Sequence, residues 1–167
     1  VIEFLNISKK IFNNKINLFL INFFFIIYLF IFCILFVYIS NIAQLKILLF
    51  SLLVCCIGSD IGGYIFGKIF KGPKLTSISP KKTISGAIGS IVFSTLFFCS
   101  LIFAFINQFN YKFLTVAIIT SIFCQIGDLL FSLLKRKAKL KDTGNILPGH
   151  GGVLDRLDGI LLGIPIG

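Results

Sequence analysis

The sequence predicts an all-α protein, a polytopic transmembrane bundle of four to five helices that forms one integral membrane domain over residues 1–167. Hydrophobic residues make up 57% of the chain, and its mean hydropathy of +1.02 lies well above that of soluble domains. Segments 16–45 and 83–111 contain no charged residue, and each exceeds the roughly 20 residues that a helix needs to cross a hydrocarbon core. The basic residues, finally, gather between such segments.

The spans follow in chain order. The run at 16–45 is expected to be a retained helix, because it is too long for a signal peptide and no small-residue cleavage site follows it. Runs 47–59 and 113–127 are shorter, and each ends at one aspartate, Asp60 or Asp128, after which apolar residues resume. We expect both to be spans with a carboxylate near one end. The chain has no methionine, and the sequence leaves open whether its ends are complete.

The basic residues predict the orientation. Fourteen of the 16 precede the first span, separate the second from the third, or follow the fourth, so alternating spans place them on one side. Only Lys46 and Lys112 fall opposite. By the positive-inside rule the basic side and the N-terminus are cytoplasmic. This distribution explains the net charge of +10 without a nucleic-acid partner.

The acidic residues point to chemistry on the same side. Five of the six gather there, where carboxylates contribute nothing to orientation: Asp60, Asp128, Asp142, Asp155 and Asp158. Cations together with metal-binding carboxylates suit a polyanionic substrate. The five cysteines lie in apolar runs without a C-x-x-C pair, so oxygen ligands and Mg²⁺ are expected rather than zinc.

Helical spacing places polar residues on shared faces. Ser121, Gln125, Asp128, Ser132 and Lys135 line one face of the fourth span, which must therefore face protein or water. Gly86, Ser90 and Ser94 form a small-xxx-small row that suits close helix contact and permits a homodimer. For Asp60 and Asp128 a buried Asp–Lys pair that fixes packing is the alternative to a metal site.

Two loops carry the remaining polar residues. The loop at 68–86 combines lysines and hydroxyls that suit phosphate oxygens, but it lacks the spacing of a nucleoside-triphosphate loop. In the last loop His150 stands between glycines, as a site residue or a turn residue. Asp155 and Asp158 then share a face of the next helix's first turn, where the helix dipole favours carboxylates.

The stretch SLLKRKAKLKDTGNILPGHGGVLDRLD, at 132–158, resembles the signature of the phosphatidate cytidylyltransferase (CDP-diacylglycerol synthase) family. SDIGGYIFGK with SPKKTISG, within 59–86, and GDLLFS, at 127–132, are similar to further blocks of that family. The resemblance covers about residues 59–158, the expected catalytic portion. Ser85 and Phe131 depart from the pattern, since the family often has glutamate at both positions.

The resemblance implies an integral membrane enzyme that transfers CMP from CTP to phosphatidic acid, giving CDP-diacylglycerol and pyrophosphate with Mg²⁺. It implies a homodimer in a bacterial-type inner (plasma) membrane, with the active site facing the cytoplasm. The metal-binding aspartates carry over to Asp128 and Asp155. The other expected catalytic residues are Asp158, Lys135, Arg136, Lys141, Asp142, His150 and Arg156, and the expected substrate-binding residues are Asp60, Ser79, Lys82 and Thr83.

Other functions stay open on the sequence. Another CTP-dependent lipid enzyme, such as a polyprenol kinase or an archaeal-type ether-lipid cytidylyltransferase, would use similar residues. A cation transporter would use Asp60 and Asp128 as ion sites within the membrane. A relative without catalysis would account for Ser85 and Phe131.

Overall fold

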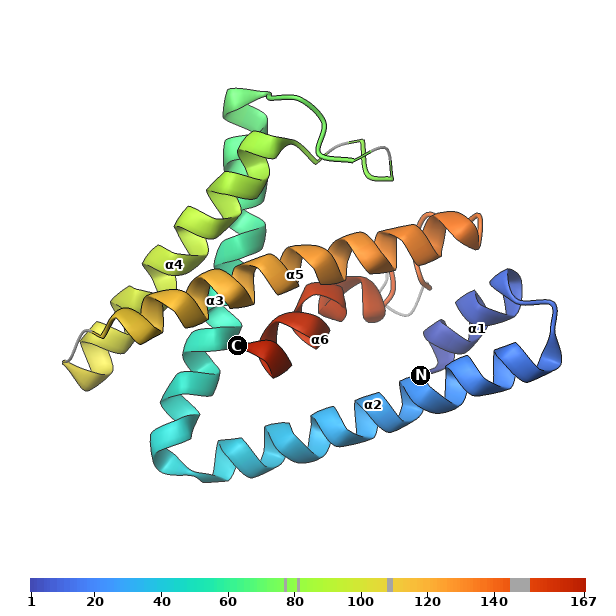
Figure 1. Cartoon of the computed structure of the whole chain (residues 1–167), viewed down its shortest axis with the longest axis horizontal. Coiled ribbons are helices and arrows are strands. Elements are labelled where there is room, and N and C mark those ends of the chain that lie inside the picture. Colours follow the sequence, from blue (N-terminus) through green and yellow to red (C-terminus); the bar gives the residue numbers. More distant parts are fainter. Residues whose placement is uncertain (77, 81, 108–109, 145–150) are drawn as a thin grey trace.

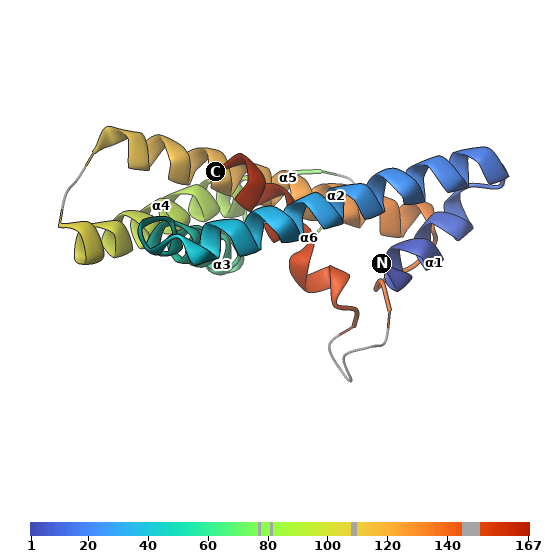
Figure 2. The same ribbon diagram turned by 90° about the horizontal axis from the view of Figure 1, so that it is seen from below.

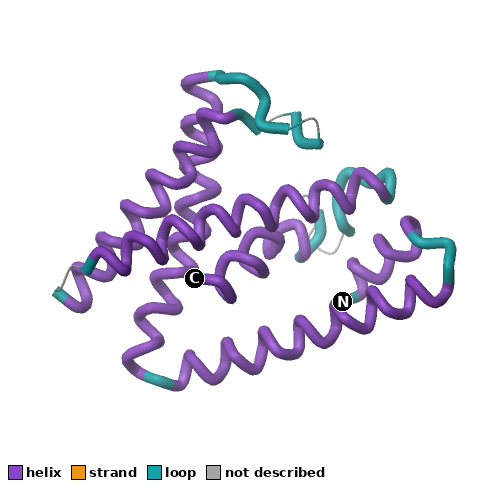
Figure 3. Tube along the Cα trace, in the orientation of Figure 1, coloured by secondary structure: helices purple, strands orange, loops and turns teal. Residues whose placement is uncertain are grey.

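The computed structural model describes residues 1–76, 78–80, 82–107, 110–144 and 151–167, which form helices and loops without a strand (Figure 3). The helices in these residues are α1 (Ile2–Ile11), α2 (Lys15–Asn41), α3 (Ala43–Phe70), α4 (Ile84–Ile106), α5 (Tyr111–Lys137) and α6 (Leu154–Ile166). Within this described part, four helices, α2 to α5, are long and apolar enough to cross a membrane. The predicted all-α membrane fold is confirmed.

The boundaries of the spans differ from the charge-free runs in two places. The first run, 16–45, contains the end of α2 and the start of α3, because the backbone is extended at Ile42 between them. No charged residue marks this turn, so the sequence pattern could not show it. At the other end α3 continues to Phe70, which places Lys68 in its last turn rather than in the loop.

The helices are arranged so that the basic segments share one end of the molecule (Figures 1 and 2). The α2–α3 connection, the end of α4 and the start of α5 lie at the left of Figure 1, whereas α1, the start of α4 and the end of α5 lie further to the right. Helices α3 and α4 pack together most extensively, followed by α5 and α6. This arrangement agrees with the alternating topology that the basic residues predict.

Small residues allow α3 and α4 to pack closely. Gly86, Ser90 and Ser94 are buried on α4, and the Ser90 hydroxyl donates to the backbone carbonyl of Ser59 over 2.7 Å. The small-xxx-small row therefore has a partner within the same chain. Helix packing was the correct interpretation of this row, but the row no longer supports a homodimer.

Gly62 offers a test of this contact. A Cβ atom there would lie 2.6 Å from Cβ of Phe93, which only a shift of the helices could relieve. We expect Gly62→Ala to destabilise the bundle by about 1–3 kcal/mol, the usual cost of overpacking, in reversible unfolding in detergent. Gly58→Ala is a milder comparison on the same helix and should cost less, since its Cβ atom would lie 3.1 Å from a Phe97 ring atom and 3.3 Å from Cα of Ser94.

Helix α1 was not predicted from the sequence. It packs Phe4 and Ile7 against Phe131 of α5 and Leu154 of α6, in a small apolar cluster next to the polar loops. Phe131, at a position where the family that the sequence resembles often has glutamate, is 8% exposed in this cluster. Its role in this chain is therefore packing.

Candidate functional site

A polar cavity of about 400 Å³ lies between α3, α4, α5, α6 and the α3–α4 loop. Its lining includes most of the acidic residues that the sequence singled out. The lining residues are Ser59, Asp60, Gly63, Tyr64, Leu75, Lys82, Thr83, Gly86, Ala87, Ser90, Gln125, Asp128, Asp155, Arg156 and Asp158. Four carboxylates from three helices thus face one cavity together with Lys82 and Arg156.

The polar stripe of α5 supplies one wall of this cavity. The Ser121 hydroxyl contacts that of Ser59 at 3.1 Å, and the Gln125 amide donates to the carbonyl of Ala87 over 3.3 Å. One turn later Asp128 accepts from Ser132 over 3.4 Å. The predicted interior face is confirmed, because its side chains contact neighbouring helices instead of lipid.

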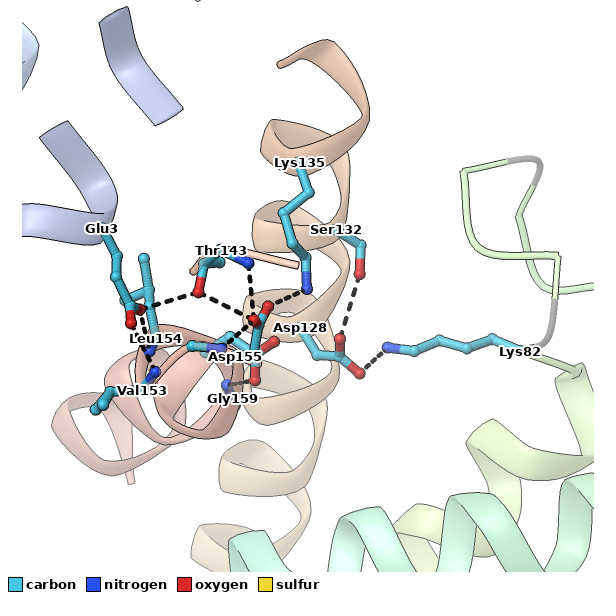
Figure 4. A network of polar contacts seen from close by, with 12 residues as sticks. Glu3, Lys82, Asp128, Ser132, Lys135, Thr143, Val153, Leu154, Asp155 and Gly159 are labelled. Carbon is cyan, nitrogen blue, oxygen red and sulfur yellow. Dashed lines mark hydrogen bonds and ion pairs between the residues drawn. The ribbon is translucent and has the colours of Figure 1, made fainter. Parts of the chain in front are cut away.

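Asp128 forms an ion pair with Lys82 (Figure 4). Lys82 reaches α5 because the α3–α4 loop folds back as a short hairpin: Leu75 donates its amide to the Lys82 carbonyl over 2.8 Å, and Ile84 donates to that of Pro73 over 3.0 Å. Thr83 then caps α4 by accepting from the Gly86 amide over 3.1 Å. An Asp–Lys pair does exist at Asp128, but its side chains are 27% and 32% exposed beside the cavity, whereas the alternative considered from the sequence was a buried pair.

Asp155 is the most firmly held carboxylate. Its Oδ2 accepts from the amides of Thr143 over 2.8 Å and Gly152 over 3.0 Å, and its Oδ1 accepts from Lys135 Nζ over 2.7 Å (Figure 4). Burial raises the pKa of Asp155, but these hydrogen bonds outweigh it and leave the pKa below its ordinary value. Asp155 is therefore an anion at neutral pH.

Asp158 experiences the opposite balance. Burial, followed by repulsion from Asp128, raises its pKa to about 7, although its own neighbour Gly159 donates an amide to Oδ1 over 2.8 Å. Asp60 adds further repulsion. The carboxylates of three helices are thus close enough to disfavour one another's charge, an environment in which a bound cation is favourable.

The carboxylates that line the cavity suit a Mg²⁺ ion that binds together with a phosphate-bearing substrate. This ion usually takes one or two protein carboxylates and completes its shell with water and phosphate oxygens. In the described residues no group of three or more His, Cys, Asp or Glu side chains could hold a metal by itself. Asp128 of α5 and Asp155 of α6 line the same polar cavity, so any Mg²⁺ held there would need water or phosphate oxygens to complete its shell.

Several predicted site residues lie elsewhere. The described structure does not bring Arg136, Lys141, Asp142 or Ser79 into the cavity. Helix α5 ends at Lys137 and the chain turns sharply at Lys139, whose φ is 55°, so that Lys141 and Asp142 are exposed beyond this turn. Asp142 faces a separate depression with Lys9 and Lys10 of α1. Lys135 does not line the cavity, but it forms an ion pair with Asp155, which does. His150 lies outside the described residues.

Two buried residues at the site were missed by the sequence reasoning. Glu3 of α1 is 6% exposed and Thr143 is 4% exposed; Thr143 contacts Asp155, and Glu3 contacts Thr143 (Figure 4). Thr143 follows a recognised K-D pair and could have been considered with it. No local sequence pattern relates Glu3 to α6, since 151 positions separate it from Leu154.

Comparison with known proteins places these features in a family. A family model described as "Cytidylyltransferase family" matches residues 2–167. The match is longer than the resemblance found at 59–158, and it includes α1 and α2. The chain is similar to proteins named "Phosphatidate cytidylyltransferase". It is 43% identical to the one from Staphylococcus haemolyticus over 126 residues, a match that covers 73% of this chain and 47% of that relative. It is 40% identical to the one from Staphylococcus aureus strain COL over 139 residues, a match that covers 78% of this chain and 51% of that relative. The chain therefore spans about half the length of these relatives.

Proposed function

The chain belongs to the cytidylyltransferase family, and we propose that it acts as a phosphatidate cytidylyltransferase, transferring CMP from CTP to phosphatidic acid. One observation carries the proposal: Asp60, Asp128, Asp155 and Asp158 face the same cavity as Lys82 and Arg156. Carboxylates with cations in one polar cavity suit a metal–polyphosphate complex. The names of the relatives support the choice of lipid substrate.

The reaction needs charge stabilisation more than a base. A phosphate monoester has a second pKa near 6, so phosphatidate is already a nucleophile at neutral pH. One of its oxygens forms a bond to the α-phosphorus of CTP, the bond to the β-phosphate oxygen breaks, and the electron pair leaves with pyrophosphate. In this proposal Lys82 and Arg156, which line the cavity together with Thr83, bind these phosphates.

Asp128 and Asp155 would hold Mg²⁺, with Asp158 and Asp60 beside them. When bound, the ion would offset the negative charge of CTP and of the departing pyrophosphate. Asp155 suits this role because three hydrogen bonds from Lys135, Thr143 and Gly152 fix its carboxylate before any ligand arrives.

The setting of this reaction is a membrane. The chain is an integral membrane protein of a family with bacterial relatives. We propose that the cavity opens to the cytoplasm of a bacterial-type inner membrane, since the basic residues gather at its end and CTP is available there. A homodimer stays a prediction from the family resemblance.

Product analysis tests the proposal. The purified chain in mixed micelles with Mg²⁺, phosphatidic acid and CTP labelled in its α-phosphate should incorporate label into lipid and release unlabelled pyrophosphate. Omission of either phosphatidic acid or Mg²⁺ should abolish both signals. A CTP-dependent kinase would instead leave the label in CDP, and that result would reject a cytidylyltransferase.

A further inference from the structure

Helix α6 begins without a side chain of its own to cap it. Its N-cap is Val153, which offers no acceptor, and the first amides of a helix have no partner within it. Glu3 of α1 supplies the acceptors: its Oε1 accepts from the Val153 amide over 2.9 Å and its Oε2 from the Leu154 amide over 2.7 Å. A carboxylate at this end is also favoured by the helix dipole. Glu3 of α1 thus caps the start of α6 (Figure 4).

The same carboxylate is connected to Asp155. Glu3 Oε2 lies 2.9 Å from the Thr143 hydroxyl, which lies 3.0 Å from Asp155 Oδ2. A hydroxyl has one hydrogen, so Thr143 donates to one of the two carboxylates at a time. Its amide donates to Asp155 in either case. Glu3 thus fixes Thr143, and Thr143 fixes the Oδ2 side of Asp155, while Oδ1 contacts Lys135.

Glycines leave the space for this arrangement. A Cβ at Gly152 would lie 2.6 Å from Glu3 Oε2, and one at Gly144 would lie 3.1 Å from Glu3 Oε1. The second glycine of the Gly-Gly pair before α6 therefore makes room for a buried carboxylate from the other end of the chain.

We infer that Glu3 is a positioning residue for the metal-binding carboxylate, setting the direction of Asp155 through Thr143 and the start of α6. The inference rests on the proposed function in assigning a metal to Asp155. Groups that orient a metal ligand from behind affect metal affinity by about 10–100-fold when they are removed.

The test measures metal binding without turnover. Mn²⁺ alone is titrated into the purified full chain and followed by electron paramagnetic resonance. We expect Glu3→Gln, which keeps the size of the side chain and removes its charge, to weaken Mn²⁺ binding about tenfold or more. Hydrogen exchange of peptides covering Val153 and Leu154 should become faster in the same variant without metal.

Two further variants separate positioning from general loosening of α1. Ser8→Ala removes the hydrogen bond of 2.7 Å from Ser8 to Asn22, which joins α1 to α2 without touching α6. It should leave Mn²⁺ affinity within about twofold. Thr143→Val keeps the shape of the side chain and removes the hydroxyl, so it should weaken Mn²⁺ binding even if Glu3→Gln fails to fold.

The outcomes are distinct. Mn²⁺ affinity within twofold of the parent in both Glu3→Gln and Thr143→Val would overturn the inference, as would a parent that binds no Mn²⁺ or an equal loss in Ser8→Ala. Loss of affinity in the two variants, in a parent that makes no CDP-diacylglycerol, would reject the proposed function and keep the positioning role.

Discussion

Asp128→Asn is expected to lower the turnover of CTP by about 10³-fold or more while the protein still inserts and folds. The substitution keeps the size of the side chain and removes the charge that would hold a metal on the CTP phosphates. Charge stabilisation by such a metal contributes several kcal/mol, and each 1.4 kcal/mol corresponds to a factor of ten in rate. The measurement is label transfer from CTP to lipid at saturating Mg²⁺, with gel filtration and circular dichroism to verify the fold.

A variant of Lys82, the ion-pair partner of Asp128, separates loss of the carboxylate from displacement of the α3–α4 loop. Removing the carboxylate also leaves Lys82 without its ion pair, so a part of the effect could come from a displaced loop. Lys82→Met leaves the carboxylate in place and should lower activity less than Asp128→Asn does. Ser132→Ala, which removes a contact of 3.4 Å to the same carboxylate, should stay within about threefold. Near-normal turnover in Asp128→Asn would contradict the metal assignment.

Local patterns in the sequence predicted the spans and the interior faces well. A long charge-free run favours a helix in a bilayer, because a helix satisfies its backbone groups within the segment, although such a run does not show where one helix ends and the next begins, as at Ile42. The stripe on α5 must likewise face protein, and it does so from Ser121 to Lys135. Lys82 and Asp155 were predicted because their motifs are local.

The remaining features depend on contacts between distant parts of the chain. No pattern in the sequence singled out Glu3 or α1, yet Glu3 is buried and accepts a hydrogen bond from the start of α6. Lys141 and Asp142 share a motif with Lys135, but beyond the turn at Lys139 their side chains are exposed and do not line the cavity. Helical spacing predicts which residues share a face of one helix. It does not predict which residues come together after the chain has turned.

Gly127→Ala is expected to lower activity about 100-fold or more, although it substitutes no polar side chain of the cavity. A Cβ atom at Gly127 would lie 2.5 Å from the backbone carbonyl oxygen of Asp158 and 3.2 Å from Cα of Gly159. Backbone atoms cannot rotate aside, so α6 must move away from α5. Asp155 and Asp158 then move relative to Asp128, and displacements near 1 Å can cost about 100-fold in rate.

Gly163→Ala is the matched control for this prediction. It adds the same methyl group on the inner face of α6, where the nearest atom, Cys56 Sγ, would be 3.1 Å away and belongs to a side chain. Its activity should stay within about tenfold of the parent, and both variants should elute at the parental position in gel filtration. Equal activities for Gly127→Ala and Gly163→Ala would mean that the distance between α5 and α6 does not control the reaction. A selective loss in Gly127→Ala would tie catalysis to the spacing of two carboxylate-bearing helices, which is what a metal shared between Asp128 and Asp155 requires.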